Sequence, residues 1–509
     1  MKLSLGRAFA IRSFSWLLLL PVFAVQAVSF QAKQVMLEHP ANGKLLKLDD
    51  NPWLLVSGHN AEHRWLSAVN LTNWQAQQIP IPTTGQFFQQ ARLAGFDGGQ
   101  LVMLTTDGVA HYQFAPSSAK VNAVSAGGQA VAVPAGSWRS LLSSSSMYRV
   151  VDDKRLNSLP FTVDVNHDQL TDFLLADFNA YQLWLQQADG SFRHFSLAID
   201  AQMKAFDEEP TYMARTPWLV DLNLDGRTDI AFAKDDSLQL FLQLADGSFS
   251  TTAQTVALGV GLTPDKQAQL RGGDGRSFKG LQINRLERLA DINGDDLMDL
   301  VVQQQQYIDV MEQNYSYHIH YGRKTATGLT FGNQPDQRIN TSGMQFEVKF
   351  VDLDNDQRLD FYTPAAQIGV RSIIRALIAG TANLELQFYK QHADGSFGAQ
   401  PVYRQDVTVE ISIGSGQVNM PLATVLKNVA GKASLVVADG EQTLRTFAPV
   451  AAKFFSDKSS KQTQPMPKRG IDALVVDLNQ DQKEDLVLPF TQQEQSVELT
   501  NQLQLLLQQ

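Results

Sequence analysis

Cysteine is absent from the 509-residue chain, so the protein cannot form disulfide bonds, bind a metal through thiolates or carry a lipid on a cysteine. Positive charge is scarce as well, because 42 lysines and arginines against 52 acids leave a formal net charge of -10. An acidic protein repels a phosphate backbone, so a nucleic-acid partner is not expected. A G-x-S-x-G nucleophile motif is also missing, and the sequence predicts no catalytic residues.

Long apolar runs are missing too, except near the N-terminus. There, three basic residues within the first 12 positions precede an apolar stretch at 16–25, which is followed by small residues. This stretch is shorter than the ~20 apolar residues that span a bilayer, and the pattern is typical of a secretory signal peptide at 1–27. We therefore expect the mature chain, 28–509, to be periplasmic or secreted and to have no transmembrane segment.

The acids are present in clusters. Five nine-residue segments share the pattern D-x-[ND]-x-D-x-x-x-D and together hold 18 of the 52 acids. Carboxylates ~4 Å apart repel each other by about 1 kcal/mol in water and by about 4 kcal/mol at an effective dielectric constant of 20, so such a cluster needs a cation. Oxygen ligands at loop positions 1, 3, 5 and 9, with a backbone carbonyl at position 7, suit a hard ion that accepts six to eight oxygens. The loops therefore predict up to five structural calcium ions.

The predicted metal ligands are the side chains at positions 1, 3, 5 and 9 of each loop. They are Asp164, Asn166, Asp168 and Asp172; Asp221, Asn223, Asp225 and Asp229; Asp291, Asn293, Asp295 and Asp299; Asp352, Asp354, Asp356 and Asp360; and Asp477, Asn479, Asp481 and Asp485. Position 12 is not acidic in any loop, which excludes an EF-hand. Short apolar runs rich in branched residues flank the loops, so each loop should connect two β-strands.

The spacing of the loops defines a repeating unit. Successive loops begin 57, 70, 61 and 125 residues apart, and the last gap is close to two units. Weaker copies without the acids fit at 423–440, 90–108 and 45–58, which gives eight units. An Asp-Gly turn within "ADGSF", which occurs three times, predicts a second hairpin in the same unit. The fold class is therefore all-β, a β-propeller of four-stranded antiparallel blades, with eight blades or alternatively seven.

The two ends of the mature chain are expected to meet. The last unit stops at residue 509 one strand short of four, and a spare strand lies at 30–40, ahead of the first unit. If this N-terminal strand completes the last blade, the ring closes and no terminal strand is left with an unpaired edge.

The acidic hairpin followed by D-G-S-F resembles the FG-GAP/VCBS repeats of integrin alpha subunits and of many exported bacterial proteins. The resemblance covers nearly all of 28–509 and implies a single calcium-binding propeller. That family prefers glycine at loop position 6, and only Gly226 matches; the other loops have Gln169, Asp296, Gln357 and Gln482. If position 6 needs a left-handed backbone, a glutamine there costs roughly 1 to 2 kcal/mol.

Three further segments stand outside this repeat. His318 and His320 alternate on one strand face and could hold a transition metal, but ordinary strand positions are the better interpretation, because no third ligand is identifiable. The glycine-rich 271–276 segment is interpreted as the tip of a long inserted loop. Apolar residues at helical spacing predict an inserted helix at 366–380, which packs on the propeller or, alternatively, docks a partner or touches a membrane peripherally.

These patterns favour an exported, calcium-binding propeller that serves as a non-catalytic module for protein or glycan binding, in adhesion or as a scaffold at the cell envelope. The ions are expected to be structural, since their ligands leave no open coordination position. The competing hypothesis is a polysaccharide lyase or hydrolase with its site on the propeller face, which would bring a basic residue or tyrosine close to a carboxylate.

Overall fold

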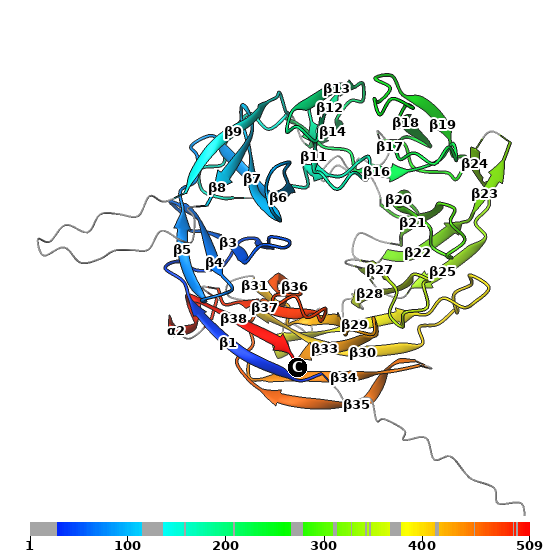
Figure 1. Ribbon diagram of the computed structural model, residues 1–509. Coiled ribbons are helices and arrows are strands. Elements are labelled where there is room, and N and C mark those ends of the chain that lie inside the picture. Colours follow the sequence, from blue (N-terminus) through cyan, green and yellow to red (C-terminus); the bar gives the residue numbers. More distant parts are fainter. Residues whose placement is uncertain are drawn as a thin grey trace, which may run out of the picture.

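The structure is a computed structural model, and it describes most of the mature chain as a ring of β-sheets (Figure 1). The described residues are 28–114, 136–156, 159–206, 209–265, 278–308, 313–326, 328–341, 344–345, 348–366, 378–412, 417–451, 453–491, 493–494 and 497–509. The predicted signal peptide, the 271–276 segment and most of the helix predicted at 366–380 lie outside these ranges. No helix among the described residues is long and apolar enough to cross a membrane.

Eight four-stranded antiparallel blades make up the ring, as the sequence predicts. Blade 1 contains β2 (Leu45–Lys47), β3 (Trp53–His59), β4 (Arg64–Asn70) and β5 (Gln75–Ile79); blade 2 contains β6 (Gly85–Arg92), β7 (Gly99–Thr105), β8 (Gly108–Gln113) and β9 (Ser137–Ser143). Blade 3 contains β10 (Thr162–Val163), β11 (Asp172–Ala176), β12 (Tyr181–Gln186) and β13 (Phe192–Leu197); blade 4 contains β16 (Pro217–Val220), β17 (Asp229–Lys234), β18 (Ser237–Phe241) and β19 (Gln254–Ala257).

The second half of the ring repeats this arrangement. Blade 5 contains β20 (Gln282–Ala290), β21 (Asp299–Tyr307), β22 (Gln313–His320) and β25 (Gln337–Thr341). Blade 6 contains β27 (Lys349–Val351), β28 (Asp360–Ala366), β29 (Thr381–Tyr389) and β30 (Tyr403–Ser412), with the short β26 (Met344–Gln345) and β31 (Gln417–Asn419) at its edges. Blade 7 contains β32 (Ala423–Lys427), β33 (Ala433–Ala438), β34 (Thr443–Val450) and β35 (Phe454–Thr463).

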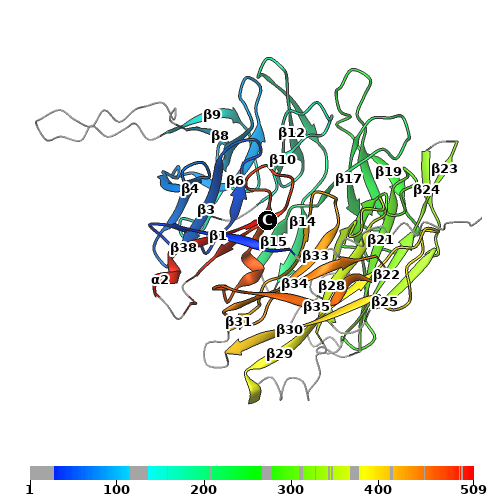
Figure 2. The same ribbon diagram turned by 60° about the horizontal axis from the view of Figure 1, so that its bottom comes forward.

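Blade 8 joins the two ends of the mature chain. Its strands are β36 (Leu474–Val476), β37 (Asp485–Pro489), β38 (Gln502–Gln508) and, at the outer edge, β1 (Phe30–Met36). The register runs without interruption from Phe30 opposite Gln508 to Met36 opposite Gln502. Both ribbon views show the blue β1 beside the red β38 (Figures 1 and 2). The predicted closure by the N-terminal strand is therefore confirmed.

The hydrophobic core lies between the faces of neighbouring blades. The second strand of a blade is covered on both faces, and all five residues of β11 and of β37 are buried. One apolar cluster contains Leu183 of blade 3 and Phe232 of blade 4, and the next contains Leu240 of blade 4 and Leu300 of blade 5. Each blade therefore stabilises two others, which is why a ring with a closed last blade is favourable.

The strand directions divide the connections between two faces of the ring. Because the four strands of a blade alternate in direction, the turns after the first and third strands emerge on one face, here called the loop face. The turns after the second strand and the links to the next blade emerge on the other, here called the opposite face. The added hairpin of β23 (Gly322–Thr325) and β24 (Gly328–Phe331) belongs to the loop face, whereas the hairpin of β14 (Gln202–Phe206) and β15 (Glu209–Met213) belongs to the opposite face. Two short helical segments, η1 (Gly470–Asp472) and α2 (Val497–Thr500), lie in connections to and within blade 8.

Candidate metal centres

The five acidic loops occupy one topological place. Each connects the first and second strands of its blade, in blades 3, 4, 5, 6 and 8, and all five therefore lie on the loop face. Position 9 of each loop is the first residue of the second strand, as Asp229 is in β17. The hairpins predicted from the flanking apolar runs are confirmed, and the three units without the acids form blades 1, 2 and 7.

The first aspartate organises the turn. In blade 4, Asp221 Oδ1 accepts a hydrogen bond from the backbone N–H of Asp225 at 3.1 Å, and Asp221 Oδ2 accepts one from Gly226 at 2.8 Å. The Asp225 carboxylate in turn accepts the N–H of Arg227 at 2.9 Å. The same three bonds recur in the other four loops. They tie the acid at position 1 to the backbone of positions 5 and 6, and the acid at position 5 to the backbone of position 7.

The loop of blade 6 gathers three carboxylates. One oxygen from each of Asp352, Asp354 and Asp356 lies within 4.8 Å of the other two. Asp354 Oδ1 is buried and has no hydrogen-bond partner among the described residues, which is unfavourable for a charged group. Lys390 pairs with Asp354, and Arg358 pairs with Asp356, so part of the negative charge is compensated. An all-oxygen cluster with an unused carboxylate oxygen fits a calcium ion.

Asparagine replaces the central aspartate of this cluster in the other loops. In blades 3, 4 and 5, its Nδ2 donates a hydrogen bond to the carboxylate at position 5, for example from Asn223 to Asp225 at 2.9 Å. Position 7 is basic in three loops, where Arg227, Arg358 and Lys483 pair with the acid at position 5. These cations lower the repulsion within the loop and would compete with a metal ion for the same oxygens.

The aspartate at position 9 lies beneath the loop and is fully buried in all five cases. These residues are Asp172, Asp229, Asp299, Asp360 and Asp485. In four of them, one carboxylate oxygen accepts a hydrogen bond from the backbone N–H of position 2. The other oxygen accepts one from a backbone N–H at the end of the third strand. Asp360, for example, accepts from Leu353 at 3.1 Å and from Gln391 at 2.9 Å. Burial raises the pKa of this carboxyl group to about 7 in four loops and to about 6 in Asp485. A divalent ion above it would favour the ionised form.

Asp229 differs from the other four. Its Oδ1 accepts the N–H of Gln243 at 2.8 Å, but its Oδ2 has no partner among the described residues, although the side chain is fully buried. A buried carboxylate oxygen without a partner costs free energy. The blade 4 loop, which also has the single glycine at position 6, is therefore a good fit for a calcium ion by the chemistry of its donors.

Two positions of each loop have a left-handed backbone. At position 6, φ is 80° for Gly226 and 71°, 64°, 69° and 66° for Gln169, Asp296, Gln357 and Gln482. At position 4, φ is also positive, for His167, Leu224, Gly294, Asn355 and Gln480. The left-handed backbone considered at position 6 is thus present in all five loops, and position 4 adds a second left-handed residue that the repeat pattern did not reveal; the strain falls on the residues other than Gly226 and Gly294.

The loops also join neighbouring blades. The backbone N–H at position 8 donates to a carbonyl of the preceding blade, from Leu359 to Ile292 at 3.3 Å and from Glu484 to Lys427 at 3.1 Å. The loop of blade 3 makes the same bond to blade 2. In blades 3, 6 and 8, the shape of the acidic loop therefore affects the junction between two blades as well as its own hairpin.

A buried glutamine below the loops was not predicted from the sequence. Gln186, Gln243 and Gln391 each donate their backbone N–H to the position 9 aspartate, and their side chains are buried. The Gln186 amide also spans two blades, because its Nε2 donates to the Arg92 carbonyl at 3.0 Å. A sequence pattern that could have identified this glutamine is Q-x-A-D-G. It occurs three times and places the glutamine three residues before the turn aspartate.

The other sequence hypotheses have simpler outcomes. His320 is buried and its Nδ1 lies 2.7 Å from the Gly332 carbonyl, whereas His318 contacts Ser316. Burial lowers the pKa of His318 to about 4, so both imidazoles suit ordinary strand positions. The 366–380 helix cannot be placed, because 367–377 lie outside the described residues.

Comparison with known proteins finds matches among solved structures. The chain matches no protein family model and no curated protein sequence. Among solved structures, a lectin of Agrocybe aegerita that recognises non-reducing terminal N-acetylglucosamine is 12% identical, with a TM-score of 0.42 over 86% of this chain and 94% of that chain. The Dos1 propeller is 7% identical, with a TM-score of 0.39 over 94% of both chains. The WD40 domain of Toxoplasma gondii coronin is 12% identical, with a TM-score of 0.33 over 84% and 87%.

Proposed function

We propose that the protein is an exported, calcium-stabilised propeller of the FG-GAP/VCBS kind that acts as a non-catalytic binding or scaffold module at the cell envelope. The observation that carries the calcium assignment is the fivefold recurrence of one loop geometry; in blades 4 and 6 it includes a carboxylate oxygen with no hydrogen-bond partner among the described residues. A hard cation with six to eight oxygen ligands satisfies such a donor set.

The role proposed for calcium is structural. Asp221 and its counterparts, together with the acids at position 5, would supply side-chain oxygens, and the position 7 carbonyl would add a backbone oxygen. The ion would neutralise the loop and hold its left-handed residues in place. Because position 8 donates a hydrogen bond to the preceding blade in blades 3, 6 and 8, ordering these loops would also fix the blade junctions.

We propose that a protein or carbohydrate binds to the opposite face, which carries the links between blades. There the β14–β15 hairpin exposes Met203, Tyr212 and Met213, which are 46%, 43% and 41% exposed. Tyr212 packs edge-on against Phe178 with ring centroids 5.1 Å apart, so its ring is held in place rather than free to rotate away. Rigid aromatic and methionine side chains are enriched in binding surfaces.

Two measurements test this proposal. Calorimetric titration of the chelator-stripped mature protein should show several calcium sites, up to five, and calcium should raise the melting temperature. Tagged mature protein should then retain one partner from a cell-envelope extract, and the variant Tyr212→Ser should lose that partner. Absence of calcium binding would refute the structural metal. Equal retention by Tyr212→Ser and the parent protein would refute the assigned recognition face.

A further inference from the structure

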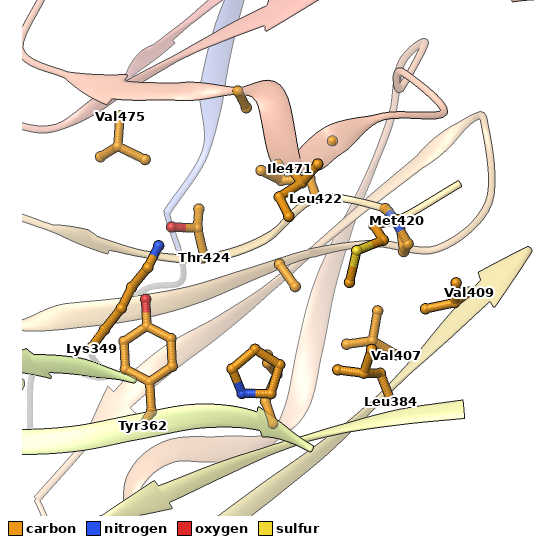
Figure 3. Close-up of a pocket in the computed structure, with 16 residues that line it drawn as sticks. Lys349, Tyr362, Leu384, Val407, Val409, Met420, Leu422, Thr424, Ile471 and Val475 are labelled. Atoms are coloured by element: carbon orange, nitrogen blue, oxygen red, sulfur yellow. The ribbon is translucent and has the colours of Figure 1, made fainter. Parts of the chain in front are cut away.

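A cavity of about 250 Å³ lies between blade 6 and the chain segments that lead into blades 7 and 8 (Figure 3). Its wall is mainly apolar. The apolar lining consists of Leu384, Leu386, Val407, Val409, Met420 and Leu422, most of which are buried. Ile471 of η1 lies at the rim and is 56% exposed, so the cavity communicates with solvent.

The cavity belongs to the opposite face of the ring. Lys349 is the first residue of β27, whereas the acidic loop of blade 6 follows the last residue of that strand. Outside blade 6, the lining comes from the link between β31 and β32 with the start of β32, and from the link that contains η1 with the start of β36. Both links join the outer strand of one blade to the inner strand of the next. The cavity is thus separated from the calcium loops by the length of a strand.

One end of the cavity is polar. Figure 3 shows the Lys349 ammonium group, the Tyr362 hydroxyl and the Thr424 hydroxyl pointing toward one another, away from Val407 and Met420. Tyr362 is buried, and its ring stacks on Phe388 with centroids 4.9 Å apart, which fixes the hydroxyl. An ammonium group flanked by two hydroxyls suits a carboxylate, because both kinds of group can donate hydrogen bonds to its oxygens.

We propose that this cavity binds a small unbranched carboxylate, with its head group at Lys349, Tyr362 and Thr424 and its aliphatic chain along Val407 and Leu384. The volume limits the chain: at ~30 Å³ for each heavy atom, the liquid volume of a water molecule, the cavity holds about eight. Two of these atoms are the carboxylate oxygens, so the best fit is a fatty acid of about six carbons. The site goes beyond the proposed calcium-stabilised module and uses none of its loops.

Isothermal titration of the calcium-loaded mature protein with a series from butanoate to dodecanoate tests the proposal. The affinity should rise by about fourfold for each methylene group up to about six carbons and then level off, because the ends of longer chains, octanoate included, leave the cavity. For octanoate we expect one site with a Kd between about 10 µM and 1 mM, the range for a ligand of this size. Octanol, which has the same chain without the charge, should bind at least tenfold more weakly.

Three variants in the cavity and one control variant assign the site. Lys349→Met should weaken octanoate binding at least tenfold, and Lys324→Met, which removes the same charge from the distant β23, should leave it unchanged. Val407→Phe should abolish binding by filling the cavity; because overpacking can destabilise a core, Ala423→Leu fills it from a half-buried rim position. The proposal is overturned if octanoate does not bind saturably, if Ala423→Leu binds it normally, or if octanol binds as tightly. Each result leaves the calcium dependence of melting intact, so the two proposals can fail separately.

Discussion

Removal of calcium should lower the melting temperature of the mature protein by roughly 10 to 15 °C. Calcium at 100 times its dissociation constant stabilises a protein by about 2.7 kcal/mol for each site, and five sites give roughly 14 kcal/mol. Unfolding entropy is about 2.1 cal/mol/K per residue, so a chain of this length changes its melting temperature by roughly 1 °C for each kcal/mol. Differential scanning calorimetry with saturating calcium, and with excess chelator plus magnesium, measures the shift. Equal melting curves in the two buffers would refute the structural role of the ion.

A single substitution can distinguish the effect of calcium binding from a general change in stability. In chelator, the three carboxylates of blade 6, with oxygens within 4.8 Å, repel by about 0.9 kcal/mol per pair in water and about 3.5 at a dielectric constant of 20. Asp354→Asn removes two of these three repulsions and loses one ion pair with Lys390, worth roughly 0 to 1 kcal/mol. The variant should therefore melt about 1 °C higher than the parent protein in chelator and about 2 to 3 °C lower in calcium.

The decisive feature is that the melting temperature of Asp354→Asn should shift in opposite directions in chelator and in calcium. Asparagine already occupies the same position in the other four loops, so the substitution introduces no foreign side-chain shape. Asp406→Asn is the matched control, since Asp406 is an exposed carboxylate on β30 of the same blade, outside the loop. If Asp354→Asn shifted the melting temperature in the same direction in both buffers, the reasoning from carboxylate repulsion would be wrong.

Three further predictions concern the backbone, the buried acid and a buried histidine. Gln357→Gly, at φ 69°, should raise the melting temperature by about 1 °C, and the reciprocal Gly226→Gln, at φ 80° with no atom within 4 Å of the added Cβ, should lower it by a similar amount. Asp360→Ala should destabilise the protein by at least about 2 kcal/mol in calcium and in chelator alike, because two buried N–H groups lose their acceptor; a loss seen only in calcium would contradict this. Burial lowers the pKa of His111 to about 4, so below pH 6.5 the unfolded chain takes up a proton that the folded chain does not. The parent protein should therefore lose about 1 kcal/mol more than His111→Gln for each unit that the pH falls from 6.5 toward 4, which urea titrations at several pH values can measure.

Much of the fold could be predicted because local chemistry repeats along the chain. The acids around Asp221 and the turn at Asp189 and Gly190 identify two hairpins of a blade from neighbouring residues alone. The spare strand that became β1 was also predictable, since the last unit lacked its fourth strand. Contacts between residues distant in the sequence were not predictable: Lys390, which follows the last residue of β29, pairs with Asp354 in the acidic loop.

The sequence by itself determined the class of fold, a propeller of eight or seven blades, and the place of the acidic loops, because turn geometry and apolar alternation act over a few residues. Tertiary structure alone decided which acids are exposed to an ion and which are buried: Asp225 stays at the surface, whereas Asp229, four residues later, begins a strand that two blades cover. It also decided the cavity beside Lys349, because that space is bounded by three blades whose residues lie far apart in the chain. Burial depends on how blades pack around the ring, and no local pattern encodes it.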